Sequence, residues 1–214
     1  MQIKLINERR REEADVTRRW IRFVVLGVIA GALLSGCGQT AEPSDVVFEE
    51  GFETGLQDWE KGSDVPEDPN HPGQPVAWSI ETSEEQASEG EKSALFVLDG
   101  VADDGTIWLT RSFDGAPNEG FTVDLAFDFW SASESFNTLA YVAAYAGDSP
   151  PTGEADFDLG QPANLAEGWK AYTYSFDVES ADSGEVWVAF GISVVWETEV
   201  TYYVDNVRVE ITPR

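Results

Sequence analysis

The sequence has few of the residues that enzymes use for nucleophilic or zinc chemistry. Its 214 residues include a single cysteine, Cys37, and a single histidine, His71. His71 lies between Asn70 and Pro72 with no Ser or Cys motif near it, so a nucleophile activated by histidine is not expected. Zinc is disfavoured because its usual thiolate and imidazole ligands are missing. We therefore expect no catalytic residues of these kinds and interpret His71 as a loop residue.

Basic residues are scarce once the first 36 residues are set aside. Four of the 40 acidic and seven of the 13 basic residues precede Cys37, which leaves 36 acids against six bases, a net charge of about −30. Such a surface repels nucleic acid and anionic lipid headgroups, so we expect no nucleic-acid partner. Acid excess with few lysines is similar to proteins of halophiles, and an acidic exported protein of an ordinary microbe is the alternative.

The sequence also lacks an apolar run long enough to span a membrane. Fourteen uncharged residues, 23–36, follow a basic lead, whereas a spanning helix needs roughly 20 apolar residues. A basic lead, a short apolar core and small residues before a break are typical of an export signal. Leu34-Ser35-Gly36-Cys37 resembles the lipobox of prokaryotic lipoproteins, which implies cleavage before Cys37 and acylation of its thiol. An ordinary signal peptide or a short anchor helix is the alternative.

These features predict the domain organisation and the location. Residues 1–36 are predicted to be a signal peptide, 37–45 the lipidated cysteine with a short polar tether, and 46–212 a single domain. Residues 17–23 partly resemble the twin-arginine export signal, with Sec export as the alternative. Acyl chains on Cys37 would give a stable membrane anchor. We expect an exported protein, anchored to the cell membrane or outer membrane and facing the periplasm or the exterior.

The predicted domain shows no helical periodicity over three turns, so helices are expected only as short decorations of loops. It has runs rich in Val, Ile, Thr and aromatic residues, separated by Gly, Pro, Asp and Asn. Many strands with turn-rich gaps predict an all-β fold of two packed antiparallel sheets or a barrel. We expect about nine strands: 46–52, 76–80, 94–98, 106–113, 121–130, 138–145, 171–178, 186–195 and 200–211.

Alternation along these strands predicts which side chains face the core. In 121–130 the odd residues from Phe121 to Phe129 are expected inside and the even residues outside. In 170–178 and 186–195 the even residues are expected inside. The apolar residues of the last strand change phase after Val204, which predicts a bulge at Asp205-Asn206.

Two gaps between the predicted strands are long. Residues 64–75 carry proline at every third position from 66, a spacing that suits an extended polyproline-like loop. The acidic segment 147–168 is long enough for a lid or binding loop, and plain surface loops are the alternative for both. Its acids Glu154, Asp156 and Asp158 are similar to the strand carboxylates of jelly-roll glucanases but lack the third glutamate. A carboxylate-dependent polysaccharide-cleaving enzyme is therefore the third choice of function.

Three short motifs occur at the start, near the third strand and at the end of the predicted domain. They are FETGLQDW at 52–59, EGEKSAL at 89–95 and YYVDNVRV at 202–209, accompanied by Gly168-Trp169 before a Tyr-rich strand. Together they resemble the galactose-binding-like jelly rolls, which include many carbohydrate-binding modules. The resemblance covers 46–211 and implies a single β-sandwich of jelly-roll type.

The same resemblance implies a structural calcium ion that ties the first strand to the last. Its side-chain ligands would be Glu53 and Asp205, with Lys92 contributing a backbone carbonyl and Glu50 replacing Glu53 if the register differs. A hard cation prefers such clustered oxygens. The alternative is that these acids are merely solvated.

Aromatic residues outside the core phase are candidates for ligand binding. Seven of the eight tryptophans follow Cys37, and aromatic faces stack on sugar rings. We predict a non-catalytic module that binds a glycan; the alternatives are a structural or adhesion module that contacts proteins at the cell surface, or rings that only cover a sheet. The candidate residues are Trp108, Trp130 and Trp187, with Asp124 and Asp128 as polar neighbours and Tyr141 and Tyr145 on the next strand.

Overall fold

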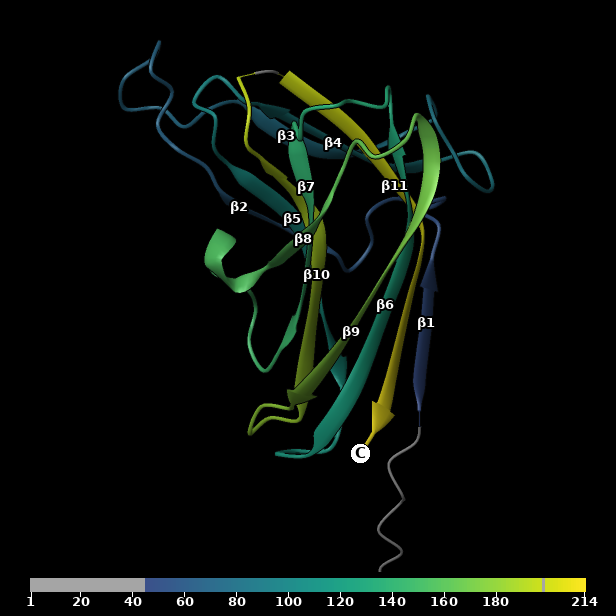
Figure 1. Ribbon diagram of the computed structural model, residues 1–214. Helices are drawn as coiled ribbons and strands as arrows, with labels where there is room; N and C mark the ends of the chain where they lie inside the picture. Colours follow the sequence, from purple (N-terminus) through teal and green to yellow (C-terminus); the bar gives the residue numbers. More distant parts are fainter. Residues whose placement is uncertain (1–44, 198) are drawn as a thin grey trace, which may run out of the picture. The chain divides into compact units, whose positions relative to one another are not determined.

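The computed structural model describes residues 45–197 and 199–214. The predicted signal peptide, Cys37 and the tether up to residue 44 lie outside the described residues. None of the helices in the described part is long and apolar enough to cross a membrane. The elements, shown in Figure 1, are β1 Val46–Glu50, β2 Glu60–Asp64, β3 Trp78–Ser83, β4 Ser93–Asp99, β5 Thr106–Asp114, β6 Gly120–Ser131, β7 Ala140–Gly147, η1 Glu154–Asp156, β8 Asp158–Pro162, β9 Gly168–Glu179, β10 Glu185–Val194 and β11 Glu199–Pro213.

The strands form two sheets whose pairings are all antiparallel. One sheet has the order β3-β4-β11-β6-β9, with β1 also paired to β11, and the other has the order β2-β5-β10-β7-β8. The predicted all-β sandwich is thus confirmed, and the three-residue 3₁₀ turn η1 is the short loop helix that was expected. Strands β2 and β8 were not predicted, because EKGSD and DLGQP contain no alternating apolar residues.

The core lies between the sheets and follows the predicted alternation. The odd residues of β6 from Phe121 to Phe129 and the even residues of β10 from Val186 to Val194 are all buried. Phe127 of β6 packs at its centre, with ring centroids 5.5 Å from Phe190 and 6.3 Å from Tyr172. Burying one such side chain contributes about 1.5–3 kcal/mol, so this interlocked set holds the two layers together.

One glycine lets two strands of the smaller sheet approach closely. A Cβ atom on Gly191 of β10 would lie 2.0 Å from the backbone oxygen of Ile107 in β5. The obstacle is backbone in a paired strand, so it cannot rotate away. The absence of a side chain at this position is therefore a packing requirement.

Gly191→Ala is expected to lower the free energy of unfolding by about 1–3 kcal/mol or more, because overpacking forces the strands apart. Urea denaturation of the variant measures this loss. Gly160→Ala is the matched control, since a Cβ there would meet only the end of the Asp158 side chain, at 3.0 Å, and no backbone. Equal stability of the two variants would contradict the packing requirement.

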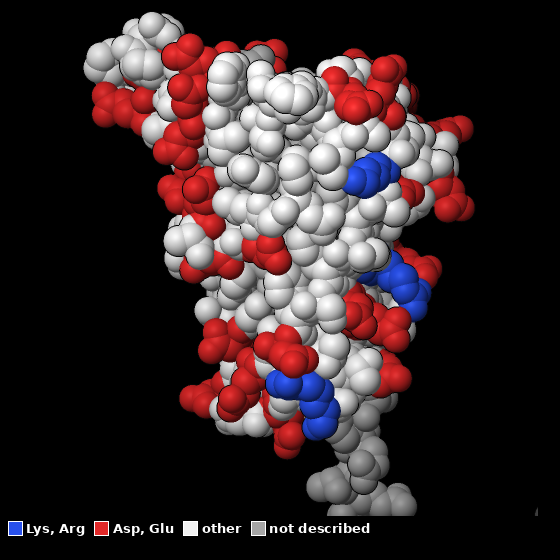
Figure 2. Space-filling model, viewed as in Figure 1, with Lys and Arg blue, Asp and Glu red and all other residues white. Residues whose placement is uncertain are grey.

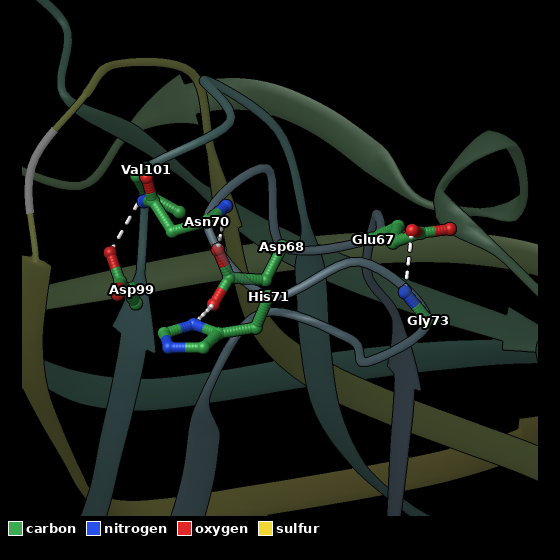
Figure 3. Close-up of polar contacts among 7 residues, drawn as sticks. All are labelled: Glu67, Asp68, Asn70, His71, Gly73, Asp99 and Val101. Atoms are coloured by element: carbon green, nitrogen blue, oxygen red, sulfur yellow. Dashed lines mark hydrogen bonds and ion pairs between the residues drawn. The ribbon is translucent and has the colours of Figure 1, made fainter.

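The proline-rich segment does not form the extended polyproline-like loop that its spacing suggested. It folds back on itself: Glu67 and Pro75 form an antiparallel bridge, and the Asp68 N–H donates to the Gln74 carbonyl. The Asp68 carboxylate accepts the Asn70 N–H at 2.7 Å and lies 2.6 Å from Nδ1 of His71 (Figure 3). These local acceptors favour a turn over an extended chain. His71 is thus an exposed loop residue, as expected.

Candidate functional site

The long strand β11 is shared by two partners along one of its edges. Residues 199–204 pair with β4, and residues 207–211 pair with β1. The change of partner from β4 to β1 occurs at the predicted bulge. The bulge is confirmed by the register shift between Asp205 and Arg208 in the pairing with β6 and by the positive φ of 50° at Asn206. Two strands from distant parts of the sequence therefore meet at Asp205.

Asp205 has a fully buried carboxylate at this junction. Its Oδ2 accepts backbone N–H groups from Ser88 at 2.8 Å and Glu89 at 3.0 Å, and Oδ1 accepts the N–H of Asn206 at 2.8 Å. Burial raises the pKa of Asp205, the three amides oppose this shift, and the nearby Asp128 adds to it. The carboxylate thus fastens the hairpin that precedes β4 to the bulge of β11.

Glu53 fastens the same hairpin from the other side. Its Oε1 accepts the N–H groups of Lys92 at 3.0 Å and Glu91 at 2.8 Å, and these bonds, in that order, lower the pKa of Glu53. Gly90, at φ +69°, has no side chain to block this approach, since a Cβ there would lie 2.1 Å from Oε1.

The two carboxylates predicted as calcium ligands therefore lie at one junction but hold backbone amides. Lys92 reaches Glu53 through its N–H and its ammonium group, and not through its carbonyl. Within residues 45–197 and 199–214 no three His, Cys, Asp or Glu side chains lie close enough together to hold a metal ion. This donor set, whose oxygens already accept backbone N–H groups, does not fit the predicted ion well, and calcium stays a prediction. Glu50, the alternative ligand, accepts the N–H of Phe52 at 2.8 Å.

Because its folded pKa lies above the ordinary value of 3.8, Asp205 binds protons more readily in the folded than in the unfolded protein. Its contribution to stability is therefore fully present below the unfolded pKa of 3.8 and is lost as the pH rises through the folded pKa. We expect Asp205→Asn to lower the free energy of unfolding by about 1–3 kcal/mol, because one of the three N–H groups that the carboxylate accepts loses its charged acceptor.

The difference between wild type and this variant should be larger near pH 4.5 than at pH 7, as measured by urea unfolding at both values. Asp124→Asn, an exposed acid on the same strand as Asp128, is the control and should change stability by less than about 0.5 kcal/mol. A difference that grows towards neutral pH would contradict the raised pKa.

The aromatic candidates are divided between the two opposite faces of the sandwich. Trp108, Trp187, Tyr141 and Tyr145 project from the outer face of the five-stranded sheet, where Trp108 is in register with Gly191 and Trp187 with Gly147. Trp130, Asp124 and Asp128 project from the outer face of the six-stranded sheet. The predicted residues therefore cannot form one common site.

Trp108 is corrected from a candidate ligand contact to a buried residue. It is only 4% exposed and belongs to a small second core with Phe157, Ala143 and Ala189. Phe157 follows η1 and packs on the indole with a centroid distance of 5.1 Å. The segment between β7 and β9, which we call the covering segment, thus covers this part of the sheet.

Glu154 anchors the covering segment. Its Oε2 accepts the hydroxyls of Thr106 at 2.7 Å and Ser193 at 2.6 Å, both of them buried. Asp156 accepts the N–H and hydroxyl of Thr152, which lowers its pKa, and Asp158 accepts the N–H of Gly160. The three acids considered for hydrolysis are thus each engaged in local structure.

Trp187 lies beside a hollow that the covering segment leaves open. The hollow has a volume of about 210 Å³ and is lined by Trp187 together with Asp58, Glu60, Arg111 and Ser112. Arg111 is held by Asp58 at 3.3 Å and by the Phe48 ring, whose centroid lies 4.3 Å from the guanidinium carbon. An aromatic ring next to fixed donors and acceptors suits a sugar ring, which has an apolar face and a hydroxyl rim.

Tyr145 extends the aromatic surface next to Trp187. Its hydroxyl lies over Gly147, the residue directly opposite Trp187, and donates to the Ser149 carbonyl at 2.7 Å. Partial burial raises the pKa of Tyr145, so its hydroxyl stays protonated at neutral pH. Tyr145 is therefore a neutral hydrogen-bonding neighbour of the hollow.

On the opposite face, Trp130 and Asp128 take part in the junction at β11. The Trp130 ring meets Tyr203 edge-on at 5.2 Å. Asp128 Oδ2 accepts the Ser88 hydroxyl at 2.7 Å and the Asn206 amide at 2.9 Å. These contacts indicate that Trp130 and Asp128 have a structural role on the six-stranded sheet.

A larger cleft of about 540 Å³ lies between β1, β11 and the hairpin before β4. Glu49, Glu50, Glu53 and Glu89 line it, and its only basic residue, Arg208, is paired with Glu49 at 2.7 Å. No aromatic ring lines this cleft, so it offers no surface for stacking a sugar. The smaller hollow is the better glycan candidate.

Four of the five lining residues of the hollow were missed from the sequence. Arg111 gave a usable signal, because it occupies an inward position in a strand whose other inward residues, Ile107, Leu109 and Phe113, are apolar. Asp58, Glu60 and Ser112 gave none, since they resemble the many other polar surface residues of this acidic chain. Figure 2 shows how widely acidic atoms are spread over the visible face and how few basic ones accompany them.

The solved structures to which this chain is similar include a carbohydrate-binding module, an adhesin domain and a cyclase. The CBM22-1 xylan-binding domain of Paenibacillus barcinonensis Xyn10C is 15% identical, with 81% of this chain and 99% of that chain covered at a TM-score of 0.45. The K3 cleaved adhesin domain of Lys-gingipain from Porphyromonas gingivalis is 14% identical over 78% and 99%, also at 0.45. A cyclase from Fischerella sp. is 18% identical over 79% and 98%, again at 0.45. No protein-family profile matches the sequence, and no curated protein matches it significantly.

Proposed function

We propose that this protein is an exported, lipid-anchored β-sandwich that binds carbohydrate without catalysing a reaction. The observation that carries the proposal is the hollow on the sheet beside Trp187, which is also lined by Asp58, Glu60, Arg111 and Ser112. The volume of about 210 Å³ is below the roughly 300 Å³ at which pockets for drug-sized ligands begin. One sugar ring of a longer chain is the ligand that this space suits.

The groups around the hollow supply each contact that a sugar requires. The indole face stacks on the apolar C–H face of the ring, and Tyr145 widens that surface. Glu60 and Asp58 accept hydrogen bonds from hydroxyls, and Arg111 donates them. The ion pair and ring contact of Arg111 fix its position before a ligand arrives, which reduces the entropy lost on binding.

Trp187→Ala is expected to weaken glycan binding at least tenfold, a loss of about 1.4 kcal/mol or more, because the stacking face is removed. A glycan array probed with the full-length chain identifies the ligand, and isothermal titration measures the affinity of the variant. Trp130→Ala is the matched control, since it removes a half-buried indole from the opposite sheet.

The control should bind within about twofold of wild type. A chain that binds no polysaccharide on the array would contradict carbohydrate binding altogether. Binding that survives Trp187→Ala and is lost in Trp130→Ala would move the site to the other face.

The proposal of a lipid anchor at Cys37 is supported by the basic residues before position 23, the short apolar run 23–36 and the lipobox-like sequence Leu34-Ser35-Gly36-Cys37. Mass spectrometry of the native protein is expected to find an N-terminal Cys37 carrying acyl chains. Cys37→Ser should remove the acyl mass and the acyl-dependent membrane association, measured by fractionation. A free thiol with residues 1–36 still attached would contradict the lipid anchor and leave the glycan proposal intact.

A further inference from the structure

Three loops at one end of the sandwich expose large apolar side chains. Phe136 lies between β6 and β7 and is fully exposed, Leu165 lies between β8 and β9 and is 46% exposed, and Trp196 follows β10 and is 51% exposed. We call these three residues the tip surface. Grouped exposed apolar residues of this kind mark interaction sites more often than single ones do.

A buried amide holds the loops of the tip surface together. Asn164 is 2% exposed, and its Nδ2 donates to the carbonyls of Asn137 at 2.8 Å and Ser135 at 3.3 Å. Its Oδ1 accepts the Leu139 N–H at 3.3 Å, and the Leu139 carbonyl accepts the N–H of Val195 at 3.1 Å. The three loops are thus joined into one ordered unit, which reduces the entropy that a partner must overcome on binding.

The tip surface lies at the opposite end of the sandwich from the start of the described chain. In Figure 1, β11 runs from that end to the C terminus, where β1 begins, and Val46 pairs with Ile211. The twelve residue steps from Glu199 to Ile211 span roughly 40 Å at about 3.3 Å per residue. The tip surface is therefore remote from the point where the chain enters the fold.

Each loop of the tip surface also carries an exposed glutamate close to its apolar residue. Glu134 is two residues before Phe136, Glu167 two after Leu165, and Glu197 next to Trp196. The loops 132–139, 163–167 and 195–197 contain no lysine or arginine. Each apolar residue of the tip surface thus has an exposed carboxylate near it in its own loop.

The exposed apolar side chains and the glutamates beside them together restrict which partner can bind the tip surface. A second copy would set glutamates against glutamates in a chain of net charge −27, and an anionic bilayer would be repelled in the same way. The three loops carry carboxylate acceptors but no lysine or arginine that could donate to the oxygens of a sugar, unlike the hollow with its Arg111. A protein with an apolar patch rimmed by lysine or arginine complements both features.

We propose that the tip surface binds a protein partner whose contact patch has an apolar centre and a basic rim. This proposal is independent of glycan binding at Trp187. The probe is an amphipathic Leu/Lys helical peptide, titrated at physiological salt against the full-length chain in phosphatidylcholine nanodiscs, with empty nanodiscs as the blank. A Ser/Lys peptide of equal charge reports attraction to the acidic chain as a whole.

The triple variant Phe136→Ser, Leu165→Ser and Trp196→Ser keeps the net charge and is expected to bind the Leu/Lys peptide at least tenfold more weakly than wild type. The variant Glu134→Gln, Glu167→Gln and Glu197→Gln should weaken binding and reduce its salt dependence. Val47→Ser, which removes an exposed apolar residue from β1, is the control and should bind as wild type does.

Equal affinity of wild type and the triple serine variant would overturn the proposal, as would equal binding of the two peptides. Flotation with added phosphatidylcholine vesicles that the triple serine variant abolishes would replace the protein partner by a lipid surface. Dimerisation that this variant abolishes would replace it by a second copy. Circular dichroism and thermal unfolding show that each variant is folded before it is compared.

Discussion

The fold depends on one buried carboxylate at the point where its last strand changes partner. β11 pairs with β6 along one edge, while β4 and β1 share the other edge on either side of Asp205. The bulge at this point brings the carboxylate under the hairpin before β4, where three backbone amides neutralise part of the cost of burying it. Without this carboxylate the N–H groups of Ser88 and Glu89 would lose the acceptor that ties the hairpin to the bulge of β11.

The two outer faces of the sandwich differ in which segments cover them. On the six-stranded sheet the hairpin before β4 and its contacts with Asp128 and Tyr203 cover the region around the bulge. On the five-stranded sheet the covering segment carries Glu154 and Phe157, which bury Trp108 and leave Trp187 beside an open hollow. The candidate site is thus the part of one sheet that no segment covers, and its walls come from strands that the core already holds in register.

The alternation of apolar and polar residues was sufficient to predict the core, because the sequence of a single strand shows which of its residues share a face. It was insufficient for the site, since phase within a strand does not say which sheet the strand joins. Trp130 and Trp187 each point away from the core-facing residues of their own strand, but the two strands belong to different sheets. The two side chains therefore lie on opposite faces of the sandwich. The burial of Trp108 depends on Phe157, far along the chain, and β2 and β8 form by pairing with strands already in place rather than by their own apolar pattern.

Charge limits what either proposed surface can bind. With 40 acidic residues against 13 basic ones, the chain as a whole repels anions, and physiological salt screens this repulsion between exposed charges beyond about 8 Å. A neutral sugar at Trp187 is not repelled by this charge, whereas a polyuronate would meet the carboxylates of Asp58 and Glu60, which line the hollow with Arg111. The tip surface lacks even that one cation, so a partner there must bring its own basic groups. Both proposals therefore follow from the same constraint, and a ligand that is strongly anionic is inconsistent with either.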